Sequence, residues 1–324
     1  MVKKVAISLG DPTSISPEIL VKGYNYFPPD VAYVVYGSSN VIEKAKSLTS
    51  SDFSYQIVHN TYHIKERGFY LIDIDNYDFE FGRPSALSGK ASVSYLQRAV
   101  EDVLSYKVDA LVTLPISKRW IMESGFKYAG HTDYLAEVSK VKEYVMVLMC
   151  PDLIVGLITT HIPLREVPTK VDTDRIVSKT VLFNNFLRNY LGKDRPKIAI
   201  LGLNPHASDN GNIGDEEGKI IVPAVEELWG MGVDATFPLS PDTAFVNYRD
   251  YDGYIAMYHD QGLIPLKMLC FRRAVNITLG LRFIRTSPDH GTGYDIAGKN
   301  LADPSSLVEA VRLAARLIGI VDLK

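Results

Sequence analysis

Three histidines each follow a strongly apolar, strand-like run of sequence. His161 follows Leu153–Thr160, His206 follows Lys197–Pro205, and His259 follows Asp252–Tyr258. In an open α/β sheet, ligands bind at the carboxyl ends of the strands. Imidazoles that reach this edge from separate strands suit a divalent metal with an open coordination position. A single such histidine is more often structural, but the threefold repetition predicts a three-histidine metal site.

Cationic and amide side chains follow the third histidine at even spacing, at Lys267, Asn276 and Arg285. Lysine and arginine are the usual partners of phosphate and carboxylate, and the arginine fork binds them in bidentate fashion. Taken singly, Lys267 and Arg285 are also compatible with a solvated surface. Arg285 lies within an apolar run, Phe283–Thr286, which favours a role in binding an anion.

Polar turns supply further candidates. Thr132, in Gly130-His-Thr-Asp133, is an expected N-cap, so that His131 and Thr132 bind an anion at a helix start or merely form a capped turn. Asp242 is either a cap or a substrate contact. Asp260 either orients the ring of His259 as a second-sphere carboxylate or caps the next element.

Size and composition bound the class of protein. The chain has 324 residues, of which 46% are hydrophobic and 23% charged, with a net charge of -3. These values indicate a globular protein of one large or two intermediate α/β domains, with no nucleic-acid surface and no membrane span. Cys150 and Cys270 lie far apart in apolar sequence, which favours buried free thiols in a reducing compartment. We therefore expect a cytoplasmic protein.

Short β-rich runs alternate with helical patterns, which predicts βαβ units around a mainly parallel sheet. The expected strands are Val5–Leu9, Ala32–Tyr36, Tyr70–Ile74, Ala110–Leu114, Tyr144–Met149, Ile154–Thr159, Ile198–Gly202, Ala235–Pro238 and Tyr254–Tyr258. The expected helices are Ser16–Tyr24, Ser88–Ser105 with Ser88 as cap, Ile116–Ser124, Thr132–Ser139, Thr173–Tyr190, Glu216–Gly230 and Pro304–Leu317. A β-rich run from Arg272 to Thr286 is expected to return from one domain to the other.

Glycine-rich motifs argue against a standard dinucleotide domain, because the first strand is not followed by GxGxxG and no Walker A sequence occurs. The loop Asp289–Asp303 is glycine-rich, follows a strand-like run and precedes the last helix. Such a loop can wrap an adenosine, with Asp295 reaching the ribose hydroxyls, or it can be an ordinary surface loop.

Several motifs together resemble the 4-hydroxythreonine-4-phosphate dehydrogenase family of pyridoxal phosphate biosynthesis. They are Thr113–Lys118, Gly130–Asp133, Thr160–Arg165, Asn204–Ala207, Tyr258–Leu263 with Lys267, Ala274–Leu281 and Asp289–Thr292. The last motif and Asp295–Gly298 are also similar to the isocitrate and isopropylmalate dehydrogenases, whose fold this family shares. The resemblance runs from Gly10 to the last helix.

The resemblance implies a homodimer of two-domain α/β/α subunits, with the active-site cleft between domains at the subunit interface. We expect residues 1–126 plus 270–324 to form a cofactor-side domain, and residues 127–269 a metal and dimerisation domain. The metal, which is zinc, magnesium or cobalt, would be held by His161, His206 and His259, shared between subunits. The implied substrate contacts are His131, Thr132, Asp242, Lys267, Asn276 and Arg285. NAD or NADP would lie against His290, Gly291, Thr292 and Asp295.

The implied reaction oxidises 4-(phosphooxy)-L-threonine and decarboxylates the product to 3-amino-2-oxopropyl phosphate. Asp242, Lys118 and metal-bound water are the candidate proton acceptors. 4-Phospho-threonate and 4-phospho-erythronate are alternative substrates, and a three-histidine hydrolase or lyase is the alternative from another class.

The chain departs from the family at Ser14 and Ser16, which replace glycines, and at Gly293-Tyr294, where the family commonly has alanine and leucine or phenylalanine.

Overall fold

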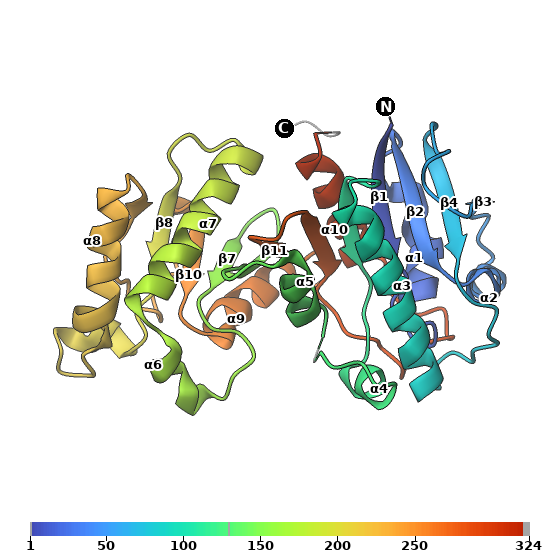
Figure 1. Cartoon of the computed structure of the whole chain (residues 1–324). Coiled ribbons are helices and arrows are strands. Elements are labelled where there is room, and N and C mark those ends of the chain that lie inside the picture. The colour runs from blue at the N-terminus through green and yellow to red at the C-terminus, as the bar shows by residue number, and fades with distance from the viewer. Residues whose placement is uncertain (1, 129, 320–324) are drawn as a thin grey trace. The chain divides into compact units, whose positions relative to one another are not determined.

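The computed structural model describes residues 2–128 and 130–319 and has the predicted α/β fold class (Figure 1). The chain divides into two compact units, one made of the residues up to Val141 together with the segment that begins at Leu281, the other of Lys142–Gly280. The unit boundaries lie at 141/142 and 280/281, whereas the sequence analysis expected them at 126/127 and 269/270. The helix α5 (His131–Ser139) precedes the first boundary, and β11 (Val275–Leu279) stays with the second unit because it pairs with β6 (Val145–Met149).

The first unit contains parallel strands in the order β3-β4-β2-β1-β5-β12. Their bounds are β1 (Lys3–Ser8), β2 (Val31–Gly37), β3 (Gln56–Ile57), β4 (Gly68–Asp73), β5 (Ala110–Thr113) and β12 (Ile284–Pro288). The strand β2 is buried throughout, as expected for a parallel strand covered on both faces. The helices are α1 (Ser16–Gly23), α2 (Ser39–Thr49), α3 (Ala86–Leu104), α4 (Lys118–Glu123), α5 and α10 (Ser305–Leu317).

The second unit contains strands in the order β11-β6-β7-β10-β8-β9. β11, β6 and β7 (Ile154–Leu157) are antiparallel neighbours, whereas β7, β10 (Gly253–Ala256), β8 (Lys197–Ile200) and β9 (Asp234–Ala235) run parallel. The helices are α6 (Val167–Lys170), α7 (Thr173–Leu191), α8 (Val222–Gly230) and α9 (His259–Cys270) (Figure 1). The helix α9 packs on β7 at Gly262, where an added Cβ would lie 2.5 Å from Val155 Cγ1.

Two expected helix caps were wrong. Ser85, not Ser88, caps α3; its hydroxyl accepts the N–H of Ser88, and the Ser88 hydroxyl in turn accepts the N–H of Ser85. This is a reciprocal capping box, so Ser88 occupies its third helical position. Gly130 is the N-cap of α5, which places Thr132 inside the helix.

Some elements were missed by the sequence analysis. The helix α9 was not expected, because Pro265 lies inside it and because its first residue, His259, directly follows the expected strand Tyr254–Tyr258. The helix α2 and the short strand β3 were also missed. The β-rich run Arg272–Thr286 contains β11 and most of β12, separated at Gly280, which has a φ of 95°.

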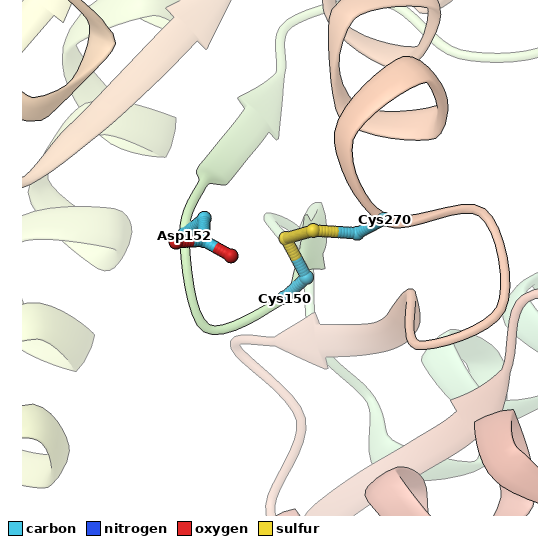
Figure 2. A group of neighbouring side chains, drawn as sticks. All are labelled: Cys150, Asp152 and Cys270. Carbon is cyan, nitrogen blue, oxygen red and sulfur yellow. A yellow bond between two sulfur atoms is a disulfide. The ribbon is translucent and has the colours of Figure 1, made fainter.

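The cysteines are buried as expected, but they are not free thiols. Cys150 and Cys270 form a disulfide with a Cα–Cα distance of 6.3 Å (Figure 2). Both lie in one apolar cluster with Leu153, Leu266 and Ala274. The expectation of free thiols was wrong because distance in the sequence does not report that the ends of β6 and α9 pack together.

Removal of this disulfide is expected to lower the free energy of unfolding. The cross-linked cysteines are 120 residues apart, so the bond restricts a long loop of the unfolded chain. The chain-entropy argument gives about 2–5 kcal/mol. Denaturant unfolding of the Cys150→Ser variant, compared with the oxidised wild type, measures the loss. Equal unfolding midpoints would show that the bond contributes nothing to stability.

No helix within residues 2–128 and 130–319 is long and apolar enough to span a membrane.

Candidate functional site

The three histidines follow three neighbouring parallel strands of the second unit. β10 lies between β7 and β8, and the chain continues from these strands to His259, His161 and His206 respectively. Parallel strands end at the same edge of a sheet, and neighbours lie about 4.8 Å apart. The strand order therefore delivers all three imidazoles to one edge, with His161 and His206 separated by the central strand.

His259 begins α9, and its neighbours fix this end of the helix. Its Nδ1 lies 2.7 Å from the Oδ1 of Asp260, so the hydrogen bond considered from the sequence is present. This contact orients the ring and leaves Nε2 as the atom for a ligand. The side chain of Gln261 accepts the N–H of Met257 and donates to the carbonyl of Gly202, which joins the ends of β10 and β8.

His206 lies in an unusual left-handed turn. The φ angles of the residues from His206 to Asn210 are all positive, between 45° and 69°. For residues other than glycine this conformation costs about 1–2 kcal/mol each. Such strain persists only where the surroundings enforce it, and it is concentrated at functional sites.

A buried carboxylate holds the backbone segment that leads into this turn. Glu217, 3% exposed, accepts the backbone N–H groups of Leu203 and Asn204 at 2.8 and 2.7 Å. Its other oxygen accepts the Asn204 amide at 2.9 Å, and the same amide donates to Glu216 at 2.7 Å. The hydrogen bond from Asn204 holds the pKa of Glu216 below its ordinary value. The carboxylates of the next helical segment thus fix the segment that carries His206.

Two of the three imidazole rings are in contact. The centroids of the His161 and His259 rings are 5.3 Å apart. In the described part of the chain, one group of three histidine, cysteine or acidic residues has a ligand atom from each member within 4.8 Å of the others. This group is Cys150, Asp152 and Cys270. His206 therefore does not close a compact triad within one chain. The three-histidine site stays a prediction, as does the sharing of ligands between subunits.

Asp242 interacts electrostatically with His206 and accepts the Ser240 hydroxyl at 2.5 Å. This hydrogen bond, more than the nearby histidine, holds the pKa of Asp242 below its ordinary value. A general base works best with a pKa near the working pH. Asp242 is therefore better suited to orient a group beside His206 than to accept a proton at neutral pH.

Two other candidates of the second unit lie on α9 and β11. Lys267 is half-buried on α9, two turns beyond His259 and so about 12 Å along the helix axis. Asn276 pairs with Leu148 of β6, and its buried Oδ1 has no hydrogen-bond partner among the described residues. An unsatisfied buried amide oxygen is costly, and a ligand N–H or hydroxyl group would satisfy it.

The first unit contains Arg285, His131 and Thr132, three of the residues that the sequence predicts to bind an anion. Arg285, on β12, is 3% exposed and donates to the Thr113 hydroxyl from Nε at 3.1 Å and from the terminal Nη2 at 2.7 Å. Burial lowers the pKa of Arg285 to about 10, so the side chain remains charged at neutral pH. Thr113 fixes one edge of the guanidinium.

His131 begins α5 near Arg285. Burial, and next the charge of Arg285, lower the pKa of His131 well below its ordinary value, so the ring is neutral. Its buried Nε2 lacks a hydrogen-bond partner in the described structure. Lys118, the first residue of α4, reaches the same helix start, since a Cβ added at Gly130 would lie 3.9 Å from its Cε. Arg285 and Lys118 thus lie near the start of α5 that carries His131, whereas Thr132 is displaced from the cap.

The predicted cofactor loop also belongs to the first unit. His290 is half-buried, its Nδ1 lies 3.0 Å from the Gly291 carbonyl, and its buried Nε2 has no partner within the described residues. Gly291 and Asp295 are exposed and accessible to a ligand. The Thr292 carbonyl accepts the N–H of Ile15 at 3.0 Å, which joins this loop to the first loop of the chain.

The residues that depart from the family pattern, Ser14, Ser16 and Tyr294, all make hydrogen bonds within the first unit. The Ser14 hydroxyl donates to the Asp11 carbonyl at 2.6 Å and lies 2.8 Å from the Ser16 hydroxyl, whose hydrogen it can accept, so the two buried serines satisfy each other. Tyr294 donates to the buried carboxylate of Asp11 at 2.8 Å, a contact that phenylalanine would not make. Sequence analysis missed Asp11, Thr113, Glu217 and Gln261, because nothing local in the sequence indicates that they fix distant loops.

Replacement of Glu217 with glutamine is expected to weaken metal binding without unfolding the protein. An amide has one acceptor oxygen and cannot accept the three hydrogen bonds that Glu217 receives from Leu203 and Asn204. Loss of such outer support reduces metal affinity by about 10- to 100-fold. Titration of the apoprotein with Zn²⁺ measures this, with the exposed Glu226→Gln as the matched control. An unchanged zinc affinity would separate Glu217 from the metal site.

Comparisons with known proteins agree with these motifs. Residues 30–314 match the model of the family described as "Pyridoxal phosphate biosynthetic protein PdxA". The chain is 62% identical to a 4-hydroxythreonine-4-phosphate dehydrogenase of Sulfurihydrogenibium sp. (strain YO3AOP1), over 97% of this chain and 98% of the relative. It is 46% identical to the Aquifex aeolicus (strain VF5) protein of that name, over 98% and 99%.

A solved structure shows the same similarity. The crystal structure of 4-hydroxythreonine-4-phosphate dehydrogenase from Klebsiella pneumoniae superposes with a TM-score of 0.87 at 36% identity, over 98% of each chain. Both the sequence and the arrangement of elements are thus shared over nearly the whole length. The chain belongs to the PdxA family of pyridoxal phosphate biosynthetic proteins.

Proposed function

We propose that this protein is an oxidoreductase that converts 4-(phosphooxy)-L-threonine to 3-amino-2-oxopropyl phosphate in pyridoxal phosphate biosynthesis. The observation that carries the proposal is 62% identity, over 97% of the chain, to a relative named for this dehydrogenation. The structure adds chemistry that suits it, namely three histidines at the ends of neighbouring parallel strands and a buried arginine beside a neutral histidine.

The histidines fit a divalent cation such as zinc, magnesium or cobalt. His161 and His259 are in ring contact, and the hydrogen bond to Asp260 leaves Nε2 of His259 as the ligand atom. A bound cation would lower the pKa of the substrate hydroxyl. Asp242, ionised beside His206, orients the polar groups there. The proposed active form is a homodimer in which the subunits share the three histidines.

The phosphate of the substrate is assigned to Arg285, His131 and Lys118. Arg285 supplies a fixed cation, and the neutral His131 donates or accepts a hydrogen bond through its unpaired Nε2. The binding energy of this remote group orients the reacting carbon.

The His290–Asp295 loop is the proposed NAD or NADP contact. The alcohol that is oxidised lies β to a carboxylate, so the product is a β-keto acid, which readily loses carbon dioxide. We propose that this takes place in the cytoplasm, with the other steps of the pathway.

A substrate panel before and after chelation tests the proposal. The purified protein is incubated with 4-(phosphooxy)-L-threonine, 4-phospho-threonate or 4-phospho-erythronate, each with NAD and with NADP, while reduced nicotinamide absorbance is recorded. We expect the highest kcat/KM for the first substrate, loss of activity after chelation and recovery with a divalent metal. Preference for a sugar acid would reassign the substrate. Turnover without nicotinamide would favour a metal hydrolase or lyase.

A further inference from the structure

The disulfide of the second unit has a carboxylate beside it. Figure 2 shows the side chain of Asp152 turned toward the joined sulfur atoms of Cys150 and Cys270. Cys150 follows β6, Asp152 lies in the turn before β7, and Cys270 is the last residue of α9. One ligand atom from each of the three residues lies within 4.8 Å of the others.

We propose that reduction of the Cys150–Cys270 disulfide creates a binding site for a soft or borderline divalent cation such as Zn²⁺ or Cd²⁺. Two thiolates select such cations over magnesium or calcium. Tetrahedral zinc bonds of about 2.3 Å hold two sulfur atoms about 3.8 Å apart, which needs small side-chain rotations from the disulfide. The Cα–Cα distance of 6.3 Å leaves room for this change.

The surroundings give the site an apolar base and an open side. Cys150 and Cys270 are 4% and 7% exposed, whereas the Asp152 side chain is 45% exposed. The cation would enter from the side of Asp152, and water would complete its coordination. The turn that brings Asp152 to the sulfurs is closed by the hydrogen bond from the Cys150 N–H to the Leu153 carbonyl, at 2.9 Å.

Charge balance also favours a divalent cation. Two thiolates and one carboxylate carry three negative charges, so a divalent cation leaves one. Arg249 lies 3.8 Å from the Asp152 carboxylate and balances that last charge. The Arg249 side chain is 77% exposed, so this contact is weak and can lengthen when the carboxylate turns to a cation.

The two forms of the site are linked by a balanced reaction. A dithiol reductant transfers two electrons and two protons to the disulfide, giving two thiols while its own sulfurs form a disulfide. Binding of the cation then releases both thiol protons, because the ligands are thiolates. In either form the end of α9 is tied to the end of β6. His259 begins α9 and Cys270 ends it, so the new site is separate from the histidines.

Cadmium titration tests the site directly. The protein is stripped of metal, fully reduced with a phosphine, freed of reductant under anaerobic conditions and titrated with Cd²⁺. The thiolate-to-cadmium ultraviolet absorption band reports sulfur ligands alone, so cadmium on histidines does not contribute. We expect the band to saturate at one cadmium per chain, to be missing in the oxidised protein, and to disappear in Cys150→Ser and Cys270→Ser.

Asp152→Asn tests the third ligand without touching the core. It is expected to weaken cadmium binding at least about tenfold. Asp234→Asn is the matched control, since the Asp234 side chain is 41% exposed and is also paired with an arginine, and this variant should bind cadmium as the wild type does. Failure of the disulfide to reduce in the folded protein, or two free thiols per chain with no cadmium band, would overturn the proposal. Wild-type affinity in Asp152→Asn would remove the carboxylate and with it the three-ligand site.

Discussion

The His206→Ala variant is expected to lose turnover and most of its bound metal while it remains folded. His206 is exposed, so alanine leaves no cavity and the two units keep their cores. A catalytic cation contributes several kcal/mol of transition-state stabilisation, and loss of about 4 kcal/mol corresponds to about a thousandfold in kcat/KM. The measurements are kcat/KM with 4-(phosphooxy)-L-threonine and the metal content of the purified protein.

The control for this variant is His63→Ala, which removes another exposed histidine that lies outside the candidate site. It should retain both activity and metal. The circular dichroism and oligomeric state of His206→Ala should match those of the wild type, which shows that the loss is local. Full metal occupancy and normal turnover in His206→Ala would exclude His206 as a ligand, and with it the three-histidine arrangement.

The Arg285→Ala variant is expected to raise the KM for the phosphorylated substrate by about 100-fold or more, with little change in the affinity for NAD or NADP. Each hydrogen bond to a charged group contributes about 1.5–3 kcal/mol, and a bidentate arginine makes two. Burial lowers the pKa of Arg285 to about 10, so the side chain remains a cation throughout the neutral range. The measurement is a set of initial rates at varied substrate and saturating cofactor.

Two further variants separate binding from folding. Arg282→Ala removes an exposed arginine three positions earlier and should not change KM. Arg285→Lys keeps the charge but loses the fork that Thr113 holds at 2.7 and 3.1 Å, so it should give an intermediate KM. A folded Arg285→Ala protein with the wild-type KM would reassign Arg285 to a structural role on β12.

The sequence alone determined most of the local elements and the positions of the candidate site residues along the chain. Short apolar runs predicted β1, β2, β5, β6, β7, β8 and β10, because strands that are covered on both faces of the sheet require such runs. The placement of histidines at the ends of three runs followed from the sequence too, and the motifs around them identified the family. These signals lie within a few residues, where one segment determines its own conformation.

The tertiary structure alone decided which of these segments are neighbours. The order β7-β10-β8, the disulfide between Cys150 and Cys270, and the Glu217 contacts to the His206 segment all join residues that are far apart or separated by loops. The left-handed turn at His206 likewise depends on contacts that the periodic pattern does not encode. Packing selects such pairings from many that the sequence permits, since their energies depend on three-dimensional proximity rather than on residue type.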